Sequence, residues 1–294
     1  MLDVRRLRLL CDLARLGTIA AVARAHTYTA SAVSQQLSAL EREAGVPLLE
    51  RTGRRVVLSA AGRVLVQHGE TVLAALEQTT TALAAMTAGL SGPLRIGAFP
   101  TAVRTLLPAA LVDLGRRHPG LELMVTELDP VAVPAALRER RLDVGLLHDY
   151  DVVPVTPDPA LDTVALLDET VFLAVPVDGP GSVRDAADAA WIMASPGTLC
   201  HRVTLHVCRT AGYVPRARHV ADDFATVLTL VAAGQGVSLV PELAAARPPA
   251  GVRLIPLATR RRTRAACRRG SATHPAVAAC VSALRASAGT FLGR

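Results

Sequence analysis

Polar side chains recur along one short stretch near the N-terminus, and their chemistry suits contact with DNA. Hydroxyl and amide groups at helical spacing can hydrogen-bond base edges or phosphates. At the same spacing Val33, Leu37 and Leu40 point the opposite way, toward a core. The pattern predicts a helix from Ser31 up to Gly45 with one DNA-contacting face. The candidate residues of this stretch are Thr29, Ser31, Ala32, Ser34, Gln35 and Ser38.

Three arginines follow in a segment that predicts a small β-wing. Residues 48–58 have the pattern of two short strands around a turn that contains glycine. The arginines are Arg51, Arg54 and Arg55. Because guanidinium groups neutralise DNA phosphates, they would make DNA affinity depend on salt.

Further along the chain, polar residues stand where predicted strands end and predicted helices begin. Free N–H groups at such helix starts suit a small anion in a cleft beyond the carboxyl ends of strands. The candidates for a small-molecule site are Thr101, His148, Asp149, Ser195, Thr198, Asp222 and Asp223. A plain N-cap role is the alternative for Thr101, Ser195 and Asp222, and a solvated loop is the alternative for Asp149 and Asp151.

Two cysteines in one predicted helix, residues 197–212, raise a redox alternative. Cys200 and Cys208 would lie about 12 Å apart in an α-helix, beyond disulfide reach unless the helix rearranges. The neighbouring His201 and His206 raise a metal alternative, but no CxxC or HxxxH spacing supports it. We expect two small core residues, with a thiol switch as the alternative, and neither a metal nor a cofactor.

Catalytic motifs are missing from the sequence. It contains no GxSxG, Walker loop, HExxH or dinucleotide fingerprint, so we do not expect an enzyme. The arginine run 260–264 with Arg268 and Arg269 is expected to protect an edge strand by charge, with contact to the DNA backbone as the alternative.

Composition places these residues in a folded, two-part chain. The 294 residues are 51% apolar and 19% charged, which excludes general disorder and suggests two domains. All 32 basic residues are arginine and the net charge is +7. Residues 1–66 hold ten arginines against five acids, whereas residues 93–252 hold thirteen against eighteen. A basic head on an acidic body is typical of a polyanion-binding unit joined to a unit with another task.

The chain shows no sign of export or of a membrane span. Residues 1–6 are not followed by an apolar leader segment, and no stretch of about 18 residues stays free of charges and turn formers. Five cysteines without a CxxC pair favour reduced thiols. We therefore expect a cytoplasmic protein.

The N-terminal elements predict a helix–turn–helix. Leucines at helical spacing predict a first helix over 3–16 that ends at Gly17, and Thr18 can cap a second over 19–25. With the helix that starts at Ser31 and the wing, they make a winged helix–turn–helix.

Several segments carry a resemblance to a known family. Together they resemble the winged helix–turn–helix of LysR-type transcriptional regulators, without a gap over roughly sixty residues. His26 stands where that family usually has leucine, and Ala30 where glutamine or proline is common. The segments are Gly17-Thr18-Ile19-Ala20-Ala21-Val22-Ala23, Ser31-Ala32-Val33-Ser34-Gln35-Gln36-Leu37, Leu40-Glu41, Gly45-Val46-Pro47-Leu48-Leu49-Glu50-Arg51 and Leu58-Ser59-Ala60-Ala61-Gly62.

A long connecting helix is predicted from Ser59 to about Ala88. Its heptad positions favour a coiled-coil dimer seam, with packing on its own body as the alternative. The resemblance favours dimerisation, because family members pair through this helix. The seam positions are Leu65, Val72, Leu76, Thr79, Leu83, Met86 and Leu90.

The rest of the chain alternates predicted strands and helices, which indicates a parallel sheet. The strands are 94–99, 121–127, 143–148, 171–176, 216–220 and 237–241, and the helices 101–118, 131–140, 197–212, 222–234 and 274–288. The segments 93–97, 118–120, 142–145 and 230–237 with Pro241 resemble the effector-binding half of the same family, which is like periplasmic binding proteins. The resemblance implies two α/β lobes, about 93–166 plus 259–294 and about 167–258, around a small ligand.

The whole pattern predicts an α/β protein with an N-terminal winged helix–turn–helix over 1–58, a linker helix over 59–92 and an effector-binding domain over 93–294. We expect a DNA-binding regulator of the LysR type controlled by a small-molecule effector, for which an anion is one option. Expected partners are double-stranded DNA and a second copy of the chain, with a tetramer and RNA polymerase contact as further options. A solute-binding protein without DNA activity and an α/β enzyme are the rivals. The absence of a signal peptide and the basic wing speak against the solute-binding protein.

Overall fold

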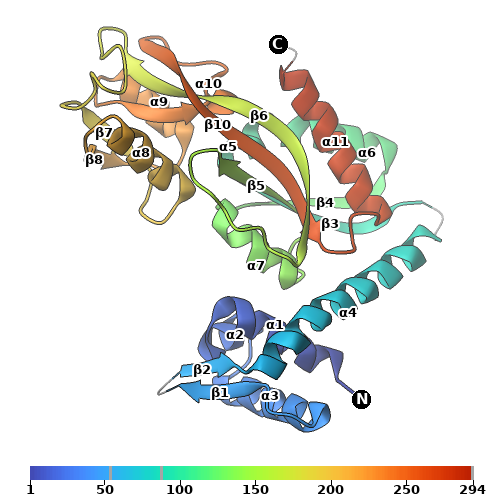
Figure 1. Ribbon diagram of the computed structural model, residues 1–294. Coiled ribbons are helices and arrows are strands. Elements are labelled where there is room, and N and C mark those ends of the chain that lie inside the picture. Colours follow the sequence, from blue (N-terminus) through green and yellow to red (C-terminus); the bar gives the residue numbers. More distant parts are fainter. Residues whose placement is uncertain (53–54, 87–88, 293–294) are drawn as a thin grey trace.

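The computed structural model has a small N-terminal head, a long connecting helix and a larger α/β body (Figure 1). It describes every residue except 53–54, 87–88 and 293–294. The head (residues 1–58) lies apart from most of the body and is joined to it by the connecting helix. The predicted mixed architecture is therefore confirmed.

The head is a helix–turn–helix with a two-stranded wing. Its elements are α1 (Val4–Leu16), α2 (Ile19–Ala25), α3 (Ala30–Ala44), β1 (Leu49–Thr52) and β2 (Arg55–Leu58). The side chains of Asp3, Thr18 and Thr29 accept hydrogen bonds from the first turns of the three helices. Gly17 and Gly45, with φ of 74° and 70°, end α1 and α3. The third helix starts at Ala30, one residue earlier than predicted, because Thr29 caps it, and it ends at Gly45 as predicted.

The connecting helix α4 (Ala60–Ala85) presents different faces to different neighbours. Ser59 caps it by accepting from the Gly62 amide at 3.0 Å. Its first turns pack on α1, and Leu65 belongs to the head core instead of an open seam. Glu77 and Thr81 are buried on another face. An exposed apolar stripe remains, made of Val72, Leu76, Leu83 and Met86.

The body is built on a mixed six-stranded sheet in the order β4-β3-β5-β10-β6-β9. The strands are β3 (Ser91–Ala98), β4 (Gly120–Glu127), β5 (Val144–Tyr150), β6 (Leu161–Pro176), β9 (Ser238–Pro241) and β10 (Val252–Arg268). In this sheet β3 pairs in parallel with β4 and with β5, whereas β10 is antiparallel to both β5 and β6. The long strands β6 and β10 cross together from one end of the body to the other (Figure 1).

The predicted role of the arginine run as edge protection is wrong. Strand β10, which carries it, lies inside the sheet between β5 and β6. The run is tolerated there because acids on the neighbouring strands pair with it: Arg260 with Asp168, Arg261 with Glu169, and Arg262 with Asp149.

One lobe packs α5 (Pro100–Thr105), α6 (Leu107–Arg117) and α11 (Pro275–Leu292) around β3 and β5. The prediction of one helix over 101–118 is wrong, because the chain breaks at Leu106 before Pro108, which cannot donate a backbone hydrogen bond. A 3-10 turn, η1 (Pro130–Ala132), and α7 (Val133–Arg138) complete this lobe.

The other lobe has its own cores, around Trp191 and around Ile192. It consists of β7 (Ala190–Met193), α8 (Leu199–Thr210), β8 (Arg216–Val220), α9 (Phe224–Ala232) and α10 (Glu242–Ala245), packed against the far ends of β6 and β10. Across the described residues, no helix combines the length and apolarity that a membrane crossing requires.

Candidate functional site

The outward face of α3 is polar and free to meet a ligand. Val33, Leu37 and Leu40 are buried, as the spacing predicts. Ser31, Ser34, Gln35 and Ser38 are exposed. This face therefore offers hydroxyl and amide groups on a rigid helix, the form in which a major groove is contacted.

The other two candidates of this stretch, Thr29 and Ala32, are less available for contact with a ligand. Thr29 accepts a hydrogen bond from the Ala32 amide at 3.1 Å, so its hydroxyl caps α3. Ala32 is half-buried. Gln36, beside Gln35, accepts a hydrogen bond from Nε of Arg6 at 2.9 Å and is tied to α1.

Of the wing arginines, Arg51 on β1 is exposed. Arg55 begins β2 and pairs in register with Thr52. Arg54 lies outside the described residues.

Between the two lobes lies a cavity of about 220 Å³ at the carboxyl end of β3. Thr101, His148, Thr198 and Asp222 line it, so four of the seven predicted small-molecule residues come together there. Other lining residues come from both lobes and include Phe99, Asp129, Cys200, Ser238 and Arg261.

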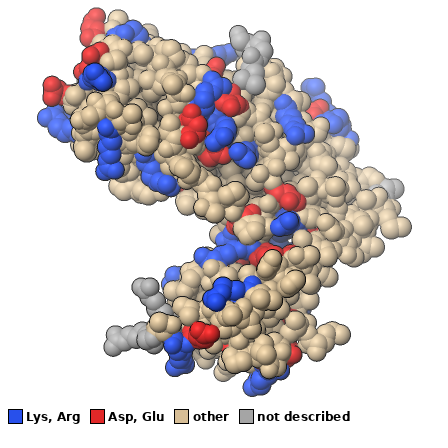
Figure 2. All heavy atoms as spheres, viewed as in Figure 1, with Lys and Arg blue, Asp and Glu red and all other residues tan. Residues whose placement is uncertain are grey.

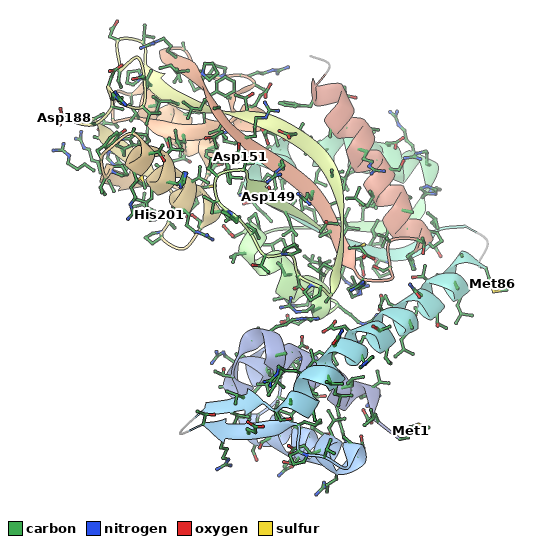
Figure 3. All side chains as sticks on the ribbon, in the orientation of Figure 1. Met1, Met86, Asp149, Asp151, Asp188 and His201 are labelled. Atoms are coloured by element: carbon green, nitrogen blue, oxygen red, sulfur yellow. The ribbon has the colours of Figure 1, made fainter. Side chains whose placement is uncertain are left out.

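The remaining three predicted residues do not line this cavity. Asp149 pairs with Arg262 at 2.7 Å and with Arg264 at 3.1 Å beside β10 (Figure 3). Ser195 donates its hydroxyl and its amide to Asp222, at 2.6 Å and 2.7 Å. Asp223 caps α9 and forms an ion pair with Arg104 of the opposite lobe. The last two positions therefore support the cleft without facing it.

Arg261, which the sequence analysis did not select, is the most unusual lining residue. Its side chain is fully buried, and its Nε donates to Oε1 of Glu169 at 2.8 Å. The other oxygen of Glu169 accepts from the Leu243 amide, while Nη1 and Nη2 of Arg261 have no hydrogen-bond partner. Burial opposes the charge, but Glu169 together with Tyr150 and Cys200 outweighs it and leaves the pKa of Arg261 raised. The cavity wall therefore holds a charged guanidinium with unused donors.

Aromatic rings and the Cys200 thiol lie around this guanidinium. Arg261 lies 5.2 Å from the centre of the Phe99 ring, and the His148 ring stands edge-on between Phe99 and Tyr150. Burial, helped by the charge of Arg261, holds the pKa of His148 well below its usual value. His148 is therefore neutral, and its Nδ1 is buried without a partner.

The cysteines lie in different environments. Cys200 lines the cavity, 3.4 Å from the Tyr150 hydroxyl and 3.9 Å from Nε2 of His148. Burial raises the pKa of the Cys200 thiol, and it raises that of Cys208, in the core around Trp191, to about 11. Neither thiol is primed as a thiolate. No group of three or more potential metal ligands gathers among the described residues.

A cluster of ion pairs lies where the head and α4 meet the body (Figure 2). Asp12 on α1 contacts Nε2 of His26 at 2.8 Å and Nε of Arg138 on α7 at 3.6 Å. On α4, Glu77 pairs with Arg268 at 2.9 Å and with Arg140 at 2.6 Å. His26, unusual in sequence, thus supports a charged contact between head and body.

Two family descriptions match the chain. "Bacterial regulatory helix-turn-helix protein, lysR family" matches residues 4–63, and "LysR substrate binding domain" matches residues 87–289. A probable hydrogen peroxide-inducible genes activator of Mycobacterium avium is 35% identical over 220 residues, which cover 72% of this chain and 69% of that protein. The DNA-binding transcriptional dual regulator OxyR of Escherichia coli is 33% identical over 218 residues, 72% of this chain and 70% of its own.

Solved structures share the fold. A mutant OxyR of Corynebacterium glutamicum aligns with a TM-score of 0.60 at 24% identity, over 100% of this chain and 93% of that one. Full-length CbnR in complex with its target DNA aligns with a TM-score of 0.54 at 23% identity, over 98% of this chain and 100% of that one.

Proposed function

The chain belongs to the LysR family of bacterial transcriptional regulators, and we propose that it binds operator DNA through α3 and senses a small molecule in the cavity beside Arg261. The observation that carries the proposal is the pairing of a rigid, outward polar helix with a cavity between two lobes. Such a cavity suits ligand binding because ligands of open α/β sheets lie beyond the carboxyl ends of strands.

In this proposal the exposed residues of α3 contact base edges, and Arg51 of the wing neutralises phosphate. Arg54 and Arg55 would add to the wing's charge. Ser34 and Gln35 are the central base-contacting residues, flanked by Ser31 and Ser38. Thr29 and Ala32 would hold the start of α3 against the DNA backbone.

The effector signal has a physical route to the head. Asp129 and Pro130 line the cavity and lead through η1 into α7, whose Arg138 contacts Asp12 of α1. A ligand that shifts η1 would change this contact and thereby the position of α3. A ligand can do so only if it binds the two arrangements with different affinity.

We further propose that the chain forms a dimer through the apolar stripe of α4. We also propose three parts: a DNA-binding domain over 1–58, a linker helix over 59–92 and an effector-binding domain over 93–294, with lobes of 93–166 plus 259–294 and 167–258. The exposed Leu83 and Met86, 65% and 83% accessible, support pairing. A tetramer through the bodies and contact with RNA polymerase extend the same proposal. We also propose that the protein is located in the cytoplasm, the compartment in which a bacterial regulator meets DNA.

The test is binding to the DNA upstream of its own gene, against scrambled DNA of equal length, near physiological salt. A preference of about a thousandfold is expected. Gln35→Ala should cost about 1–3 kcal/mol on the native fragment, whereas Gln36→Ala, whose side chain is held by Arg6, should change specificity little. Arg51→Ala should lower the salt slope by about one on both fragments.

Equal, weak and steeply salt-dependent binding to both fragments would contradict the proposal, because it is the signature of a generic basic surface. A solute-binding protein or an enzyme would also lose nothing when Gln35 and Arg51 are replaced. Only a regulator loses specificity with one replacement and salt dependence with the other.

A thiol switch is the second candidate, since relatives are peroxide-inducible genes activators and Cys200 lines the cavity. In such a switch, the Cys200 and Cys208 thiols give up two electrons and two protons and form a disulfide, and one hydrogen peroxide takes them up and becomes two water molecules. Both thiols are protonated and sit within one helix, so α8 would first have to unfold. The test is a count of free thiols before and after peroxide treatment. Loss of two thiols in the wild type but not in Cys200→Ser or Cys208→Ser would favour the switch over effector binding.

A further inference from the structure

The unused donors of Arg261 define what the cavity can hold. A buried polar group without a partner costs free energy, so a guanidinium with two unpaired terminal nitrogens is a poor structural feature on its own. Its Nε edge is already occupied by Glu169. The Nη1/Nη2 edge matches the two oxygens of a carboxylate, which guanidinium binds in a bidentate manner.

The rest of the lining argues against a simple anion. Glu127, Asp129 and Asp222 line the same cavity and are exposed at its rim. Among the described lining residues, Arg261 is the one arginine, and Glu169 offsets its charge. A ligand that carries only a carboxylate would have to pass these three acidic side chains to reach Arg261, whose charge Glu169 already offsets. Repulsion between like charges disfavours the binding of such a ligand. A cation carried by the same ligand would remove that cost.

The size of the cavity restricts the ligand further. About 220 Å³ is the volume of roughly seven water molecules at about 30 Å³ each, and it lies below the range of drug-sized ligand sites. Phe99, Leu128, Phe224 and Val227 supply apolar lining in the same cavity. The site therefore suits a molecule of about ten non-hydrogen atoms, charged at one end and partly apolar.

We propose that the effector is a free α-amino acid or a similarly small zwitterion, with its carboxylate on the Nη1/Nη2 edge of Arg261 and its ammonium group toward Asp129, Asp222 and Glu127. This rests on the proposed effector function and names the ligand class of the same cavity. His148 supplies neutral polar lining beside the carboxylate, because burial keeps it unprotonated. Specificity among amino acids would come from the apolar lining, to which Phe224 and Val227 contribute.

The experiment measures the melting temperature of the full-length protein with each of the twenty amino acids at millimolar concentration. For every amino acid that raises it, affinity is then compared with two analogues: the acid that lacks the amino group and the amide that lacks the carboxylate. The proposal expects at least one amino acid to bind, and both of its analogues to bind at least tenfold more weakly. No response to any of the twenty, or equal affinity for the deaminated acid, would overturn it.

Variants assign the contacts. Arg261→Gln should abolish amino acid binding, and Arg261→Lys should weaken it at least tenfold while keeping the charge beside Glu169. Asp129→Asn should reduce the discrimination between the amino acid and its deaminated analogue, since the amide can still accept from the Val131 amide. Arg260→Gln is the matched control, because Arg260 is next in the chain but pairs with Asp168 at 2.8 Å outside the cavity. If Arg260→Gln loses binding as Arg261→Gln does, the site is assigned wrongly.

Operator binding measured on the same samples separates this proposal from the proposed function. Specific DNA binding without any amino acid response would leave the regulator intact and reject the amino acid effector. An amino acid response without specific DNA binding would keep the cavity assignment and reject the regulator.

Discussion

Arg138, on the body, places its Nε 3.6 Å from Oδ1 of Asp12, on the head. Arg138 also forms an ion pair with Asp158, and Asp12 holds His26 at 2.8 Å. All these side chains are largely buried. The contact joins the two halves of the chain through charges with little access to water, where removal of one partner leaves the others uncompensated.

We therefore expect Arg138→Gln to lower the free energy of unfolding by about 1–3 kcal/mol and to raise amide hydrogen exchange in α1. Arg117→Gln is the control, since its pair with Asp113 on α6 is 46% exposed at both side chains and should matter by less than about 0.5 kcal/mol. Equal effects from the two variants would show that the Asp12 contact does not hold the head to the body.

Gly270 of the body lies close against the connecting helix. A Cβ there would lie 2.5 Å from the carbonyl oxygen of Ala74 in α4, and the φ of 87° already disfavours alanine. Gly212 has a similar φ of 98° but open space around it. Gly270→Ala should therefore cost more than Gly212→Ala, by about 1–3 kcal/mol in urea unfolding. Equal costs would mean that α4 does not pack on the body at this point.

The apolar stripe of α4 predicts self-association. Leu76 and Leu83 are 44% and 65% exposed, on the side away from Glu77. Charges at seam positions are strongly disfavoured in a coiled coil, so Leu76→Asp with Leu83→Asp should shift sedimentation from dimer toward monomer. Thr71→Glu, on an exposed position outside the stripe, should leave the dimer unchanged. A wild-type monomer at micromolar concentration would refute the seam.

Local signals made the head and α4 predictable. Each helix start has a polar cap within three residues of the amides it binds, as with Thr18 and Thr29, and Gly17 ends α1 by its own backbone freedom. The heptads of α4 were visible for the same reason. Only the division of its faces between head, body and solvent needed the folded chain.

The role of Arg261 could not be predicted because its partner is remote. Glu169 lies 92 residues earlier, and pairing depends on β10 entering the sheet between β5 and β6. An arginine in a charged run is usually solvated, so sequence alone favoured an exposed edge. Thr101 and Thr198 were found because they follow local strand and helix boundaries, whereas Arg261 lies in the middle of a strand.

His148 predicts an acid-sensitive body. Its folded pKa lies well below the usual 6.5, because the ring is buried and faces Arg261. Below about pH 6.5 the unfolded chain takes up a proton that the folded chain does not, so the free energy of unfolding falls as pH drops, by up to about 1.4 kcal/mol per unit. Above that pH the effect vanishes because His148 is neutral in both states.

We expect His148→Phe to flatten this dependence, since phenylalanine keeps a ring between Phe99 and Tyr150 but cannot titrate. His206→Phe, at an exposed position of α8, should leave the slope as in the wild type. Urea unfolding at pH 5 to 8 measures all three proteins. Parallel profiles for wild type and His148→Phe would mean that His148 is protonated as readily in the folded chain as in the unfolded one, and the neutral cavity wall assigned to it would be wrong.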